Sequence, residues 1–142
     1  MLMLVACKKD KLEGDSSILI GEWEWTYSDY FFSQCDPPAS FKTIDPDSEE
    51  VNYSMKFHEK GIVEFYRDGN LIDKHRVVVE QFEIGFCFAD TKFDFTIYPD
   101  NDKDNYISGC IGNDKVVIGM GFPYYDHEDG CYNYTNYFDR VE

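Results

Sequence analysis

The fold is decided by the stretch "GEWEWTYSDY", residues 21–30, in which apolar and polar side chains alternate. Trp23, Trp25 and Tyr27 occupy every second position, and Glu22, Glu24 and Thr26 occupy the alternate ones. Successive side chains of a β-strand point to opposite faces of a sheet, and aromatic residues favour strands. The stretch therefore predicts a strand with one aromatic face and one polar face.

The rest of the chain carries the same signal in seven further stretches. They are separated mostly by short turns rich in Asp, Asn and Gly, among which Asp68-Gly69 is a typical hairpin signal. Strands joined by such turns pair with their neighbours in the sequence. We expect one strand in each of the ranges 51–61, 62–70, 71–84, 92–100, 105–114, 115–125 and 131–142.

Eight sequential strands predict an all-β fold, an eight-stranded antiparallel up-and-down barrel. Closure removes the exposed strand edges that an open sheet would present. One connection is long: residues 31–50 contain "CDPPASFKTIDPD" and are interpreted as a loop. Long loops without secondary structure are usually functional or disordered, so this connection is a candidate functional segment.

Charge and length limit the classes of function that the chain can have. The chain has 142 residues, which suits one domain with a sizeable core. Its 28 acidic and 13 basic side chains give a net charge of −15. Such a chain repels the phosphates of nucleic acids and anionic lipid headgroups. We therefore expect no nucleic-acid partner, and membrane attachment only through a covalent lipid.

The two ends of the predicted barrel carry a family pattern. Gly21 and Trp23 form a Gly-x-Trp motif at the start of the first strand, and Arg140 lies near the end of the last. Together with the eight strands, this resembles the small lipocalin-like domains of bacterial lipoproteins. The resemblance implies that Arg140 lies across Trp23 and closes the barrel floor without binding ligand, and that the long loop folds over an open mouth. The chain lacks the C-terminal helix of many animal lipocalins.

The first residues, "MLMLVACKKD", place a short apolar run directly before a cysteine. The segment Leu4-Val5-Ala6-Cys7 resembles a bacterial lipobox, which implies a diacylglyceryl thioether on Cys7. The run is too short for a whole secretory signal, and we interpret the missing basic region as a late or truncated start codon. The alternative is a frayed terminus with an ordinary thiol. Lys8 replaces the aspartate that retains lipoproteins at the inner membrane of enteric bacteria, so we expect the outer membrane, with a periplasmic or surface-exposed position.

The sequence thus divides into three parts. Residues 1–7 are a residual signal with its lipobox, and residues 18–142 are the lipocalin-like barrel. Residues 8–17, "KKDKLEGDSS", are charged or small and predict a flexible tether between them.

Aromatic residues gather at one end of the predicted barrel. If the end where the first strand finishes is called the upper end, the long loop and the turns at 99–105 and 123–130 all lie there. Concave, aromatic-lined sites with a few polar groups are the usual form of a small-molecule pocket. The alternative is that large side chains plug a barrel of this size. The candidate ligand-binding residues are Trp25, Tyr27, Phe31, Phe32, Phe41, Tyr124 and Tyr125.

The expected function is a lipid-anchored bacterial envelope protein that holds a small apolar or amphipathic ligand in its calyx. The competing function is an interaction module with a side-chain-filled barrel that displays its loops to a protein or glycan partner. An open cavity would favour the first function, and a filled barrel the second.

The sequence gives little support for an enzyme or a cofactor. His58 and His75 fall on the apparently polar faces of strands, and His127 falls in an acidic turn. There is no nucleophile elbow and no phosphate-binding loop. The segment "DNDKDN", residues 100–105, spaces Asp100, Asp102 and Asp104 like the opening of a calcium loop. It lacks the turn glycine and the bidentate glutamate of that loop, so we favour a solvated hairpin turn.

Four cysteines remain after Cys7, an even number that suggests two disulfides in an exported chain. In the proposed barrel, Cys35 and Cys131 lie at the upper end of adjacent strands, and Cys87 and Cys110 at the lower end of another adjacent pair. Adjacent strands are about 4.8 Å apart, within the reach of a disulfide.

We therefore predict the disulfides Cys35–Cys131 and Cys87–Cys110, the first of which would hold the long loop to the barrel. Peptide mapping of the unreduced protein would recover these two crosslinked pairs. A peptide joining Cys110 to Cys131 would contradict the strand order, and four free thiols would contradict export.

Overall fold

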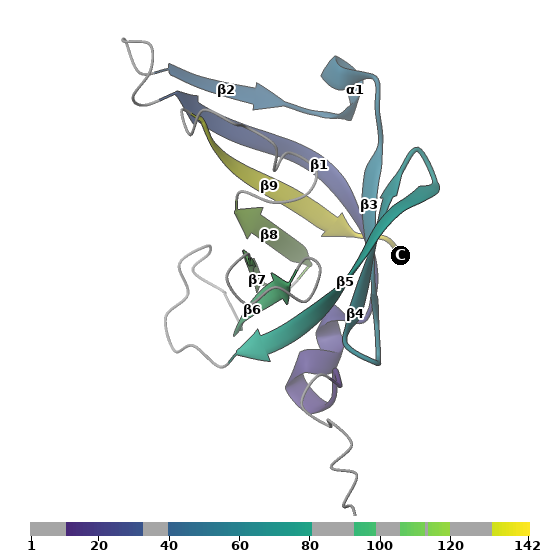
Figure 1. Cartoon of the computed structure of the whole chain (residues 1–142). Helices are drawn as coiled ribbons and strands as arrows, with labels where there is room; N and C mark the ends of the chain where they lie inside the picture. Colours follow the sequence, from purple (N-terminus) through teal and green to yellow (C-terminus); the bar gives the residue numbers. More distant parts are fainter. Residues whose placement is uncertain (1–10, 33–39, 81–92, 99–105, 113, 120–131) are drawn as a thin grey trace, which may run out of the picture.

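The computed structural model describes residues 11–32, 40–80, 93–98, 106–112, 114–119 and 132–142 (Figure 1). These residues form nine strands, a 3₁₀ helix called η2 and one short α-helix. The elements are η2 Gly14–Leu19, β1 Gly21–Phe32, β2 Ser40–Ile44, α1 Pro46–Glu49, β3 Tyr53–His58, β4 Ile62–Arg67, β5 Asn70–Glu80, β6 Phe93–Tyr98, β7 Ile107–Ile111, β8 Lys115–Gly119 and β9 Tyr132–Arg140.

Eight of the strands close into a barrel. Their order is β1-β3-β4-β5-β6-β7-β8-β9, and β9 pairs back onto β1. Every pairing is antiparallel, and every barrel strand pairs with its sequence neighbour apart from the short insertion of β2. The predicted eight-stranded up-and-down barrel is confirmed.

The ninth strand, β2, is a feature that the sequence did not predict. It pairs with the second half of β1, Ser28–Phe32, while β3 pairs with the first residues, Gly21–Glu24. The connection over residues 31–50 was expected to be a loop, but it contains β2 and then α1. Helix α1 begins where the Asp45 carboxylate accepts a hydrogen bond from the backbone N–H of Ser48, a typical N-cap.

Strand β1 also contains a β-bulge between Trp25 and Tyr27. A bulge adds one residue to a strand and so exchanges its two faces. Trp25 is 1% exposed and faces the core, but Ser28, not Tyr27, is the next buried residue. Tyr27 stacks instead on Tyr137, with ring centroids 4.3 Å apart. The expectation that Tyr27 shares the face of the two tryptophans is therefore wrong.

The residues expected to form a flexible tether are ordered in their described part. Leu12 is 3% exposed and its backbone N–H donates to the Glu59 carbonyl at 2.9 Å. Helix η2 follows, and its last residue, Leu19, is fully buried. The tether prediction is wrong for residues 11–17, because the leucine at position 12 packs into the core and η2 covers the lower end of the barrel (Figure 1).

Large side chains fill the lower part of the barrel. Phe57 and Phe95 meet edge to face, with centroids 5.6 Å apart, and both are 1% exposed. A β-carbon added at Gly109 would overlap the ring of Phe95, so the glycine leaves the space that this ring occupies. The largest fully buried side chains are Trp23, Trp25, Phe57, Phe65, Phe95, Phe138, Leu19, Met55, Ile97, Ile111 and Ile118.

Arg140 joins the last strand to the floor of the barrel. Its guanidinium carbon lies 4.2 Å from the centre of the Trp23 ring, so the predicted contact is present. The same guanidinium donates to the carbonyls of Ile18 and Ile20, while the Trp23 indole N–H donates to the Leu19 carbonyl at 2.9 Å. Arg140 and Trp23 therefore bind η2 to the point where β1 and β9 meet.

Replacing Arg140 by alanine removes a partly desolvated cation–π contact and the donors of two carbonyls. We expect the variant to lose about 0.5–2 kcal/mol of unfolding free energy, measured by urea denaturation. Arg67→Ala is the matched control, because Arg67 is exposed and lies 5.9 Å from the Tyr53 ring. If both variants lose the same free energy of unfolding, the contacts of Arg140 where β1 and β9 meet make no special contribution to stability.

Candidate functional site

Above the apolar floor, the barrel interior contains a chain of buried polar groups. The Trp25 indole N–H donates to the Ser28 hydroxyl at 2.8 Å, and that hydroxyl donates to the Asn136 side-chain carbonyl at 2.5 Å. Ser28 and Asn136 are fully buried. The bulge in β1 makes this arrangement possible, because it turns Ser28 inward opposite Asn136 of β9.

Aromatic rings adjoin this polar chain. Tyr53, at the upper end of β3, meets Trp25 edge to face with centroids 5.5 Å apart. Tyr53 is only partly buried and packs against the core. The upper interior therefore combines aromatic surface with buried polar groups, whereas the floor is apolar.

A histidine lies on the opposite wall. In the closed order of eight strands, β5 is four strands away from β9. His75 of β5 pairs with the fully buried Val63 and meets the Phe65 ring edge to face at 5.3 Å. Its side chain is 5% exposed, and its Nε2 lies 2.9 Å from the Asp73 carboxylate.

The sequence prediction that His75 faces outward is therefore wrong. Its position two residues before the buried Val77 is the signal that could have placed it inside, since residues i and i+2 of a strand share a face. Charged residues surround His75, so the sequence indicated polar side chains on both faces of this strand; they are Asp73, Lys74 and Arg76.

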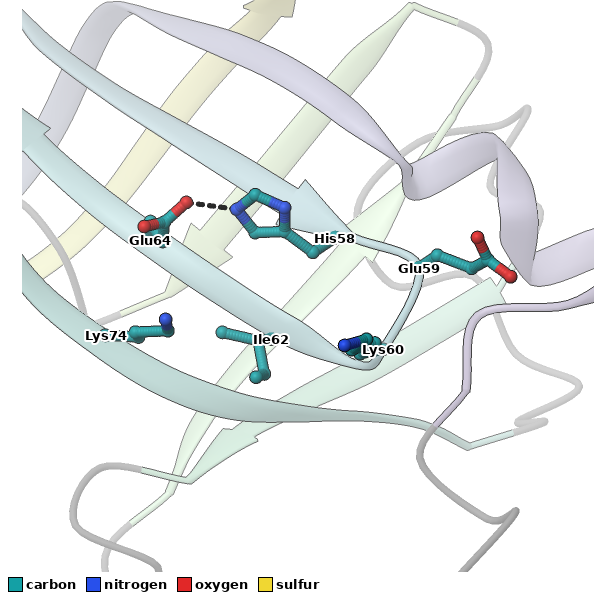
Figure 2. Close-up of a pocket in the computed structure, with 6 residues that line it drawn as sticks. All are labelled: His58, Glu59, Lys60, Ile62, Glu64 and Lys74. Carbon is teal, nitrogen blue, oxygen red and sulfur yellow. Dashed lines mark hydrogen bonds and ion pairs between the residues drawn. The ribbon is translucent and has the colours of Figure 1, made fainter.

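The outer wall has a shallow hollow beside the β3–β4 turn, bordered by β4 and β5 (Figure 2). Figure 2 shows the His58 ring pointing to the Glu64 carboxylate, to which its Nε2 is hydrogen-bonded. This hydrogen bond is the main cause that lowers the pKa of Glu64 below its ordinary value. The residues that line the hollow are His58, Glu59, Lys60, Ile62, Glu64 and Lys74.

Charges of opposite sign surround this pair on the same outer face. Glu22 pairs with Lys56, Lys56 with Glu64, and Glu64 with Lys74, across four adjacent strands. Opposite charges at directly paired positions stabilise a sheet. This face is thus explained by the stability of the wall, without a ligand.

The structure gives side-chain positions for only some of the site residues predicted from the sequence. For Phe31, Phe32 and Phe41 the structure gives only backbone register, in which Phe31 pairs with Phe41 of β2. Cys110 is 1% exposed on β7. The remaining predicted residues, Cys7, Cys35, Cys87, Cys131, Asp100, Asp102, Asp104, Tyr124, Tyr125 and His127, lie outside the described residues.

The described residues contain neither a membrane-spanning helix nor a group of metal ligands. No helix in that part of the chain is long and apolar enough to cross a membrane. Within the same residues, no three His, Cys, Asp or Glu side chains are grouped so that they could hold a metal ion. Comparisons of the chain with family models, with curated proteins and with solved structures give no match.

The His58–Glu64 pair predicts a pH-dependent contribution to stability. Since the folded-state pKa of Glu64 is lowered, its stabilising effect is present above the ordinary pKa of 4.5 and is lost as the pH falls through the lowered value. We expect Glu64→Gln to lower the urea midpoint at about pH 7, and the difference from wild type to vanish in acid below both pKa values.

Glu59→Gln is the control for this measurement, because Glu59 lies in the same hollow and its side chain is 67% exposed. It should change the midpoint little at either pH. A loss in Glu64→Gln that stays equal at both pH values would assign the effect to packing instead of charge.

Proposed function

We propose that this chain is a lipid-anchored protein of a bacterial envelope that binds a small amphipathic ligand in the upper part of its barrel. The observation that carries the proposal is the change in the barrel interior along its axis. The floor is filled by apolar side chains, while Trp25, Ser28 and Asn136 place buried polar groups beside aromatic surface above it.

Such a combination suits a ligand with an apolar body and a polar head. Small-molecule sites are mostly apolar and contain a few fixed polar groups that orient the ligand. Trp25 was among the candidate ligand residues, and Ser28, Asn136 and Tyr53 join it from neighbouring strands. The filled floor limits the ligand to the upper end, which supports a small occupant.

The position of the N-terminal segment determines which end of the barrel a lipid anchor on Cys7 would hold. Lys11 forms an ion pair with Glu59 in the β3–β4 turn, at the lower end of the barrel, with a 3.7 Å separation. The four residues from Cys7 to Lys11 span at most about 14 Å. An anchor on Cys7 would therefore hold the closed lower end near the outer membrane and leave the upper end directed away from it.

The filled floor is also the observation that favours the competing function, an interaction module that presents its upper loops to a protein or glycan. The two functions differ in whether the upper interior takes up a small molecule. Native mass spectrometry of the Cys7→Ser variant, produced in the host with a complete signal sequence and purified without detergent, would distinguish them. We expect a bound molecule of constant mass that leaves on denaturation, and an interaction module would instead give the bare chain.

The anchor is tested separately. With a complete signal sequence restored, the wild type should enter the detergent phase of a Triton X-114 partition, and Cys7→Ser should stay in the aqueous phase. Leu71→Ser, at an exposed position on β5, is the control for the loss of an apolar side chain, and it should partition like the wild type. Equal partitioning of wild type and Cys7→Ser would contradict the lipid anchor.

A further inference from the structure

His75 has a polar atom that the fold leaves unused. Among the described residues, nothing forms a hydrogen bond with its Nδ1, although this atom is buried. The other ring nitrogen, Nε2, lies 2.9 Å from the Asp73 carboxylate. Buried polar atoms without a partner are rare in proteins, and each one calls for an explanation.

The Asp73 contact decides the chemical character of the free atom. A carboxylate accepts hydrogen bonds, so Nε2 carries the proton and donates it. In a neutral ring this contact fixes the single proton on Nε2, because the hydrogen bond of one ring nitrogen sets the tautomer. In that tautomer Nδ1 has a lone pair and is a hydrogen-bond acceptor.

The pair connects an exposed group to the interior of the barrel. The Asp73 side chain is 40% exposed, whereas that of His75 is 5% exposed. The β5–β6 pairing ends at Arg76 and Tyr98, one residue from His75. On the other side, His75 pairs with Val63 of β4, which pairs with the floor residue Phe57. Because the strands of a closed barrel tilt, His75 therefore lies between the floor and the upper end.

We propose that His75, held by Asp73, is the polar anchor of the binding site and accepts a hydrogen bond from a hydroxyl or N–H group of the ligand. This assignment rests on the proposed function and names the ligand class more closely: an uncharged amphiphile with a donor head. The high negative charge of the chain, −15, also disfavours an anionic head.

The test compares two probes that differ in one donor. 1-Decanol and methyl nonyl ether have the same number of carbon and oxygen atoms, but only the alcohol donates a hydrogen bond. Isothermal titration of the full chain should show that wild type binds the alcohol about three- to tenfold more tightly, the range for one uncharged hydrogen bond.

Two substitutions separate the two ring nitrogens. His75→Gln places an amide near Nε2, so it can still donate to Asp73 but has no acceptor at Nδ1, and we expect it to lose the preference. His75→Asn places its amide near Nδ1 and should keep a preference. His58→Gln, on the outer wall, is the control and should bind both probes as wild type does.

A second measurement tests directly whether the Nδ1 atom of His75 carries a proton. In ¹⁵N NMR spectra, the Nδ1 resonance of His75 should show a nitrogen without a proton, and it should shift with decanol but not with the ether. Equal binding of both probes by wild type, unchanged in His75→Gln, would overturn the role of His75 and leave the calyx standing. If neither probe binds, both the role of His75 and the calyx are overturned. Tighter binding of decanoate than of decanol would overturn the uncharged ligand class and leave the calyx standing.

Discussion

The pairing of β9 with β1 is the constraint on which the rest of the structure depends. It converts a series of hairpins into a closed barrel in which every barrel strand has two neighbours. The closure is held where the strands meet, because Arg140 covers Trp23 and both bind the carbonyls of η2 and the residue after it. The N-terminal segment, the first strand and the last strand are thereby fixed by one cluster of contacts.

The bulge in β1 is the second determinant, and it separates two environments inside the same barrel. Before the bulge, Trp23 and Trp25 face inward and extend the apolar floor. After it, Ser28 faces inward and links Trp25 to Asn136. Without the extra residue, Tyr27 would take the inward position and the polar chain would not form. The polar groups of the upper interior therefore depend on the β-bulge in β1, the strand that closes the barrel with β9.

The sequence predicted the barrel because its strands follow the two-residue period and its turns are short. It also predicted the contact of Arg140 with Trp23, since the ends of the first and last strands must meet in a closed barrel. It did not predict the inward turn of Ser28, because a bulge leaves no composition signal in "WEWTYSDY". Leu12 was missed because a single leucine in a charged segment shows no periodicity, and His75 because charged neighbours hid the period of β5.

The same physical logic explains why His75 differs from His58. Both histidines contact a carboxylate, but the outer pair lies in a wall of alternating charges, where the His58 side chain is 38% exposed to solvent. The inner pair lies against Val63 and Phe65, where no group of the described residues forms a hydrogen bond with Nδ1. A fold selected only for stability would be served by an apolar residue at position 75, because an unpaired buried acceptor costs free energy. A histidine there, hydrogen-bonded to the partly exposed Asp73, fits the proposed role of a group that a ligand completes.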